Sequence, residues 1–239
     1  MFNGLYSQHN SPSEAEMAAQ TLSEETTYRF PTFSSNDAVT LGLSIRKRFR
    51  GSSRHVAKGR GLVIKIQTIA GHDLFSCTVG ELGAASSLGD VSLDAWAAID
   101  GMINVVRRTG HSSYYVEKGI GAIGKTPKDI GIRGDYSVNG GAFPIWLQNC
   151  LVCPIAIVAV YGGSSYDDHR VKQLVVTSIR DYLTKTYNFK ADLTETQSPS
   201  TMGPSNGRRS MEWVQNHAVA EAYPTRSMRA ESPFEEYGE

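Results

Sequence analysis

Residues 62–79 read LVIKIQTIAGHDLFSCTV, and this stretch decides the fold. Runs of β-branched and aromatic residues at 62–67 and 74–79 flank Ala70-Gly71-His72-Asp73, whose composition is typical of a tight turn. The pattern predicts two antiparallel strands joined as a hairpin. A sheet built on this hairpin needs helices to cover its apolar faces.

Amphipathic helices are expected on both sides of the hairpin. Before it, Ser34 and Asp37 form a start that resembles a capping box, followed by apolar residues at helical spacing: Ala38, Leu41, Ile45 and Phe49. After it, Ser92 can cap a helix that ends at Gly110, with an apolar face of Trp96, Ile99, Ile103 and Val106. A last helix begins near Asp167-Asp168 and buries Val171, Leu174, Val175, Ile179, Tyr182 and Leu183.

Three more strands are predicted after a glycine-rich stretch at 119–134, namely Tyr136–Asn139, Ala142–Gln148 and Pro154–Tyr161. The elements then follow the order α-β-β-α-(α)-β-β-β-α. Short turns between strands favour antiparallel pairing. The sequence therefore predicts an α/β protein of the α+β class, with one layered domain and an antiparallel sheet of about five strands flanked by helices.

The two ends of the chain differ in composition from its centre. Residues 1–29 are polar and are predicted to form an arm, in which residues 12–19 make a short helix behind Ser11. Residues 191–239 are rich in polar residues, Pro and Gly, which predicts a mostly flexible C-terminal tail. Residues 30–190 are expected to form the domain.

Composition argues against several classes of partner. The 24 Lys and Arg residues balance 24 Asp and Glu residues, so no general attraction to nucleic acid or to an anionic membrane is expected. The longest apolar run, at 151–161, contains Pro154 and is about half the length of a membrane-spanning helix. No export signal is visible, and three cysteines cannot make a complete disulfide framework. We expect a cytoplasmic protein.

The chemistry-bearing residues gather first at 111–115. His111 follows a predicted helix end and stands beside Ser112, Ser113 and Tyr114. These side chains can donate or accept hydrogen bonds or coordinate a ligand. His111 could bind a ligand or act as a general base. The alternative is structural: His111 satisfies the last helical carbonyls while Ser112 or Ser113 caps the next turn.

A second candidate lies at the start of the last helix. His169 follows Asp167 and Asp168, and a carboxylate partner would fix its tautomer and raise its pKa. The alternative is that these residues only stabilise the first turn of a helix and have no catalytic role. The candidate catalytic residues are therefore His111, His169 and Asp168, and no metal site is predicted.

Several strings in this order resemble the HbpS-like haem-degrading family of the GlcG/HbpS superfamily, as a divergent fungal-type member. The strings are Phe30-Pro31-Thr32-Phe33, Val63-Ile64-Lys65-Ile66 with Gly71-His72-Asp73-Leu74-Phe75, Asn104-Val105-Val106, Gly110-His111-Ser112-Ser113-Tyr114-Tyr115, Gly140-Gly141-Ala142-Phe143-Pro144-Ile145, Tyr161-Gly162-Gly163 and Asp168-His169. The resemblance covers roughly residues 28–187. One departure is clear, because the Arg-Lys pair that usually follows the family's tryptophan falls here on Gly101-Met102.

The resemblance implies a profilin-like domain, a cytosolic homo-oligomer and, as in some relatives, haem as a possible ligand. The ligand-binding residues that it implies are His111, Ser112, Ser113, Tyr114, Gly141 and Phe143. Neither nucleic acid nor a membrane is an expected partner.

Three functions are compatible with these observations. The first is a cytosolic oligomeric protein that binds or degrades a small haem-like ligand. The second is an accessory enzyme of fungal small-molecule (secondary metabolite) biosynthesis, in which His111 or His169 transfers a proton on a non-haem substrate. The third is an oligomeric interaction protein without catalysis, which reaches its partners through the two tails.

Overall fold

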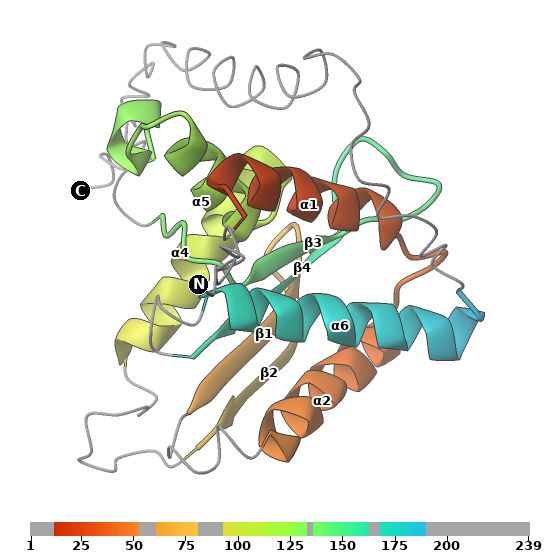
Figure 1. Ribbon diagram of the computed structural model, residues 1–239. Coiled ribbons are helices and arrows are strands. Elements are labelled where there is room, and N and C mark those ends of the chain that lie inside the picture. Colours follow the sequence, from red (N-terminus) through yellow and green to blue (C-terminus); the bar gives the residue numbers. More distant parts are fainter. Residues whose placement is uncertain (1–11, 53–60, 81–92, 133–135, 163–167, 190–239) are drawn as a thin grey trace, which may run out of the picture.

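A computed structural model describes residues 12–52, 61–80, 93–132, 136–162 and 168–189 (Figure 1). Several predicted features lie outside the described residues. These are the cap at Ser11, the cap at Ser92, Asp167 and the C-terminal tail.

Within the described residues the sheet has four strands: β1 (Leu62–Thr68), β2 (Asp73–Val79), β3 (Ala142–Ile145) and β4 (Ala156–Tyr161). Their spatial order is β2-β1-β4-β3, and each neighbouring pair is antiparallel. The hairpin predicted at 62–79 is confirmed, because β1 and β2 pair directly across a short turn. A register shift between Ile66 and Gln67 interrupts the ladder near this turn.

Helices cover both faces of this sheet (Figure 1). They are α1 (Glu14–Thr27), α2 (Ser35–Gly51), α4 (Leu93–Thr109), α5 (Ser113–Ala122) and α6 (Asp168–Tyr187), with a 3₁₀ turn, η1, at Pro127–Ile130. α2 and α6 pack on one face and α4 packs on the other. α5 lies against the C-terminal part of α4, and α1 lies across α5.

Alternation along β1 explains the two layers. Ile64 and Ile66 face the cluster of α2 and α6, whereas Val63 faces α4, because successive side chains of a strand point to opposite faces. The predicted helical faces are also confirmed: Ile45 of α2, Ile99 of α4 and Ile179 of α6 are fully buried. The structure therefore has the predicted α+β class.

The predicted strand at Tyr136–Asn139 is wrong, so the described part of the chain has four strands and not the five expected. These residues form an irregular segment. Tyr136 and Val138 alternate with polar residues, but they pack against a separate cluster that includes Val105 of α4 and Ile120 of α5. The alternating apolar side chains are half-buried against helices, and the segment pairs with none of the strands that the structure describes.

The N-terminal helix is longer than predicted and starts two residues later. Ser13, and not Ser11, is its N-cap, and its hydroxyl and the Glu16 carboxylate form a reciprocal capping box. The helix runs to Thr27 and buries Ala18 and Glu25. The region predicted as a polar arm thus contains a helix that is packed on the domain.

Candidate functional site

The first turn of α5 is fixed by two serines. Ser112 is the N-cap, and its hydroxyl accepts a hydrogen bond from the backbone N–H of Tyr115 at 3.2 Å. The hydroxyl of Ser113 accepts from the N–H groups of Gly141 and Ala142, at 3.2 and 3.0 Å. The structure thus shows the capping role that was one alternative for Ser112, and it uses Ser113 to join α5 to the start of β3.

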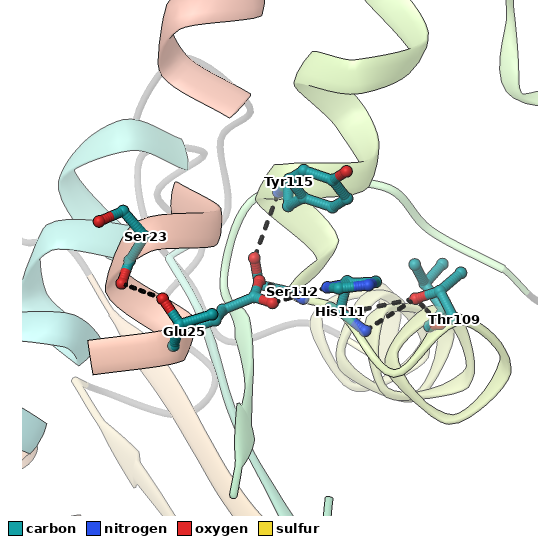
Figure 2. Close-up of polar contacts among 8 residues, drawn as sticks. Ser23, Glu25, Thr109, His111, Ser112 and Tyr115 are labelled. Atoms are coloured by element: carbon teal, nitrogen blue, oxygen red, sulfur yellow. Dashed lines mark hydrogen bonds and ion pairs between the residues drawn. The ribbon is translucent and has the colours of Figure 1, made fainter. Parts of the chain in front are cut away.

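His111 is paired with a carboxylate from α1 (Figure 2). Its Nδ1 lies 2.8 Å from Oε2 of Glu25, and Oε1 of Glu25 accepts from the N–H of Ser112 at 2.8 Å. The Glu25 side chain is only 3% exposed. A helix N-terminus and an imidazole are both suited to hold a carboxylate, so α1 supplies an intramolecular anion to the start of α5.

The ring of His111 also contacts Tyr115, with 4.8 Å between the ring centroids. Burial, and then the nearby Glu25 carboxylate, raise the pKa of Tyr115 to about 12. Tyr115 is therefore a neutral phenol that packs against His111, and it is not an acid or base near neutral pH.

Tyr114 meets the second predicted histidine. Its hydroxyl lies 3.0 Å from Nδ1 of His169, at the start of α6. Tyr114 is buried at 2% exposure, whereas His169 is exposed. The structure therefore brings together two residues that are 55 positions apart in the chain.

Partial burial, followed by the ammonium groups of Lys172 and Lys118, lowers the pKa of His169 below its usual range. The sequence predicted the opposite direction, from a carboxylate partner. The direction of the shift differs from that expectation because the loss of hydration and the two cations outweigh the opposing effect of Glu24. His169 is consequently neutral near pH 7 and can accept a proton.

Two lysines complete the surroundings of Tyr114. The ammonium groups of Lys118 and Lys172 lie 5.3 and 5.6 Å from the centre of its ring, within the range of cation–π attraction. Lys118 is paired with Glu117 at 2.7 Å, and Lys172 is paired with Glu24. We refer to Tyr114, His169, Lys118 and Lys172 as the α5–α6 cluster.

Neither lysine was predicted as a site residue, although the spacing of each from a candidate residue could have indicated it. Lys118 stands four residues after Tyr114 and Lys172 three residues after His169, so each shares a helix face with a candidate residue. Gly101 and Met102, the positions at which the resemblance would place a basic pair, are buried. Met102 is fully buried in α4 and packs in the cluster that covers the sheet.

Two predicted ligand-binding residues have packing roles instead. A Cβ atom on Gly141 would overlap the carbonyl oxygen of Val160, so this glycine allows close approach of two backbones. Phe143 is 2% exposed and belongs to the core beneath α2 and α6. Asp168 begins α6. Among the predicted site residues in the described part of the chain, His111 pairs with Glu25 and Tyr114 pairs with His169.

Neither a metal centre nor a membrane helix is found in the described part of the chain. No group of three or more His, Cys, Asp or Glu side chains there could hold a metal ion. No helix there combines the length and hydrophobicity that a bilayer crossing requires.

Comparison with solved structures identifies proteins of similar fold. A yeast protein, Ybr137w, aligns with a TM-score of 0.58 and 24% sequence identity, covering 71% of this chain and 89% of its own. The chain shares the fold of Ybr137w. No model of a known protein family matches the sequence.

More distant structural neighbours include a protein named in the sequence resemblance. HbpS of Streptomyces reticuli, as a double mutant, aligns with a TM-score of 0.38 and 16% identity, covering 62% of this chain and 88% of its own. A complex of PduOC with haem aligns with a TM-score of 0.43 and 14% identity, covering 62% of this chain and 94% of its own.

Proposed function

We propose that this chain is a cytoplasmic, homo-oligomeric protein that binds a small anionic ligand of the haem type, and that the α5–α6 cluster is its binding site. The observation that carries the proposal is the pairing of a buried Tyr114 with an exposed His169 between two lysines. A hydrogen bond at Nδ1 orients the imidazole, which is how ligand histidines are commonly held. The two ammonium groups favour a ligand that carries negative charge.

The residues fit a haem in two respects. With Nδ1 of His169 held by Tyr114, Nε2 is the nitrogen that would coordinate iron. Lys118 and Lys172 lie over the ring of Tyr114 and would attract the carboxylates of the macrocycle. Bound haem would supply a redox-active iron, and the chain's own residues would orient it and balance its charge.

A haemin titration tests this proposal. The purified protein is titrated while the Soret band is followed, and gel filtration checks that the assembly is intact. We expect saturable binding that is lost in His169→Ala and retained in His72→Ala, a matched control in the exposed hairpin turn. His111→Ala should weaken binding less than His169→Ala, because His169 is the coordinating residue of this proposal and His111 lies outside the α5–α6 cluster. Equal binding by wild type and His169→Ala would contradict the site.

A second candidate function is an enzyme that transfers a proton through His169. It is favoured by the lowered pKa of His169, which keeps the imidazole in the basic form near pH 7. Tyr114 would act as the positioning residue, since its hydroxyl holds Nδ1.

Incubation with a metabolite mixture tests this candidate without an assumed substrate. We expect consumption of a compound by wild type that is abolished in His169→Ala and strongly reduced in Tyr114→Phe, with both variants still folded. Turnover that survives in His169→Ala would remove this histidine from the chemistry.

A further inference from the structure

The N-terminal helix places its carboxylates on the groups that surround Tyr114 and His169. Glu25 is bound by His111 and the N–H of Ser112, each at 2.8 Å, and Glu24 is paired with Lys172. At the start of the helix, Glu14 lies 3.9 Å from Lys118 and fills the space beside Gly121. Three carboxylates of one helix thus pair with the cations and hydrogen-bond donors of this region.

These contacts are the ones that a ligand's carboxylates would make. An N–H at a helix N-terminus, an imidazole and an ammonium group all bind carboxylates through charge-assisted hydrogen bonds. The Lys172 side chain is only 3% exposed, and removal of its counter-ion would leave a buried charge without a partner. Glu24 can therefore be replaced at Lys172 by another anion, but not by a neutral molecule.

Apart from these polar contacts, the helix packs mainly on α5, and Met17 accepts a hydrogen bond from the hydroxyl of Tyr114 at 3.4 Å. The helix contains four Glu and no Lys or Arg, and it buries only Ala18, Thr21 and Glu25. Its apolar contacts belong to a small cluster with α5 and the end of α4, separate from the two clusters that cover the sheet. The chain is fixed again at Phe30, whose N–H donates to Trp146 O at 2.8 Å and whose carbonyl accepts from Gln148 N at 2.9 Å.

We infer that α1 is a displaceable cover over the α5–α6 cluster, and that a ligand bearing two carboxylates releases it by taking the places of Glu24 and Glu25. The inference rests on the proposed function, because it places the ligand at the same cluster and at the adjacent His111 and Ser112. It adds that the ligand carries two carboxylates and that displacement of α1 regulates its binding. In the free protein the carboxylates of α1 occupy the site. The apparent affinity for the ligand is therefore the intrinsic affinity multiplied by the fraction of molecules in which the cover is open.

Hydrogen exchange on the full-length protein tests the release directly. Two probes are used: haemin, and protoporphyrin IX, which has the same two carboxylates and no iron. With saturating probe we expect faster exchange of the amides of residues 14–27, while β1 and β4 exchange as before. Slower or unchanged exchange in α1 on saturation would overturn the inference.

Affinity measurements on charge variants provide the second test. Glu24→Gln/Glu25→Gln removes two competing charges, and we expect it to bind each probe about tenfold more tightly than wild type. Glu16→Gln is the matched control, since it makes the same change on the same helix away from the cluster, and Gln also serves in a capping box. Equal affinity of wild type and the double variant would contradict the inference that α1 covers the site.

The outcomes separate the cover from the ligand site. Binding that depends on His169, without release of α1 and without tighter binding by the double variant, overturns the cover and leaves the proposed function standing. Binding by the double variant but not by wild type supports the cover. Failure of wild type and the double variant to bind either probe overturns the proposed function and the cover together.

Discussion

His169 shows how one residue's surroundings set its chemistry. The imidazole is hydrogen-bonded to Tyr114, and its pKa is lowered first by partial burial and then by Lys172. The protonated form is therefore disfavoured in the folded protein relative to the unfolded chain, in which the pKa is about 6.5.

The first prediction concerns the charge of Lys172. In Lys172→Met the nearby cation is removed and Glu24 loses its partner, and both changes favour protonated His169. We expect the pKa of His169, followed by NMR titration, to rise toward or above 6.5. Lys65→Met, in β1 beside Asp73 and Asp100, is the control and should leave this pKa unchanged. A pKa that stays low in Lys172→Met would show that burial and Lys118 set it without Lys172.

The second prediction follows from the same shift in pKa. Because the folded-state pKa of His169 lies below the unfolded value, the unfolded chain takes up the proton first as pH falls through about 6.5. Stability is then lost between that pH and the folded-state pKa. Thermal melts between pH 7 and pH 5 should fall less steeply for His169→Gln than for wild type. Identical pH dependence of the two proteins would contradict a lowered pKa.

The third prediction concerns Gly141. A Cβ atom at this position would overlap Val160 O and lies close to Met102, so Gly141→Ala must force the strands or α4 apart. We expect a loss of about 1–3 kcal/mol in the free energy of unfolding, measured in urea. Gly51→Ala is the matched control, since nothing lies within 4 Å of its Cβ position, and it should be neutral or slightly stabilising.

At the scale of elements, the N-terminus of α2 is fixed twice. The hydroxyl of Ser34 accepts from the N–H of Asp37, whose carboxylate accepts in return from the N–H of Ser34. The same carboxylate accepts from the hydroxyl of Tyr182 on α6. Although burial opposes it, these hydrogen bonds lower the pKa of Asp37. One residue therefore caps α2 and ties it to α6.

The fourth prediction tests this cap. Ser34→Ala should lower the free energy of unfolding by about 1 kcal/mol in chemical denaturation, the usual effect of losing a serine N-cap. Ser35→Ala makes the same change one residue later, at the first helical position, and should have little effect. A similar loss in both variants would contradict a specific contribution of the Ser34 cap, because Ala has a higher helix propensity than Ser.

At the scale of the whole molecule, all named helices and strands lie between residues 14 and 187. The fifth prediction is that a chain ending at residue 189 keeps the melting temperature, haemin binding and assembly of the full chain. Light scattering should give a multiple of the protomer mass, which is 26.1 kDa for the full chain. Loss of haemin binding on truncation would place part of the site in residues 190–239. If truncation removes only the binding of a partner protein, the result would instead support the third function, an interaction protein that reaches its partners through its tails.

The sequence by itself determined the class of the fold. The hairpin at 62–79, the cap at Ser34 and the buried faces of α4 and α6 were predicted because each depends on the local periodicity of a few consecutive residues. The same local reasoning failed at Tyr136–Asn139. Its alternation is that of a strand, but a strand also needs a neighbour with free hydrogen-bonding groups, and these residues pack against helices instead.

Only the tertiary structure decided the site. His111 and Tyr114 were found from their residue types, but their partners Glu25 and His169 lie 86 and 55 positions away, and Lys118 and Lys172 come from two different helices. Local patterns carry no information on which distant side chains meet. Packing of α1, α5 and α6 brings these charges together, and their mutual distances and burial set the pKa of His169.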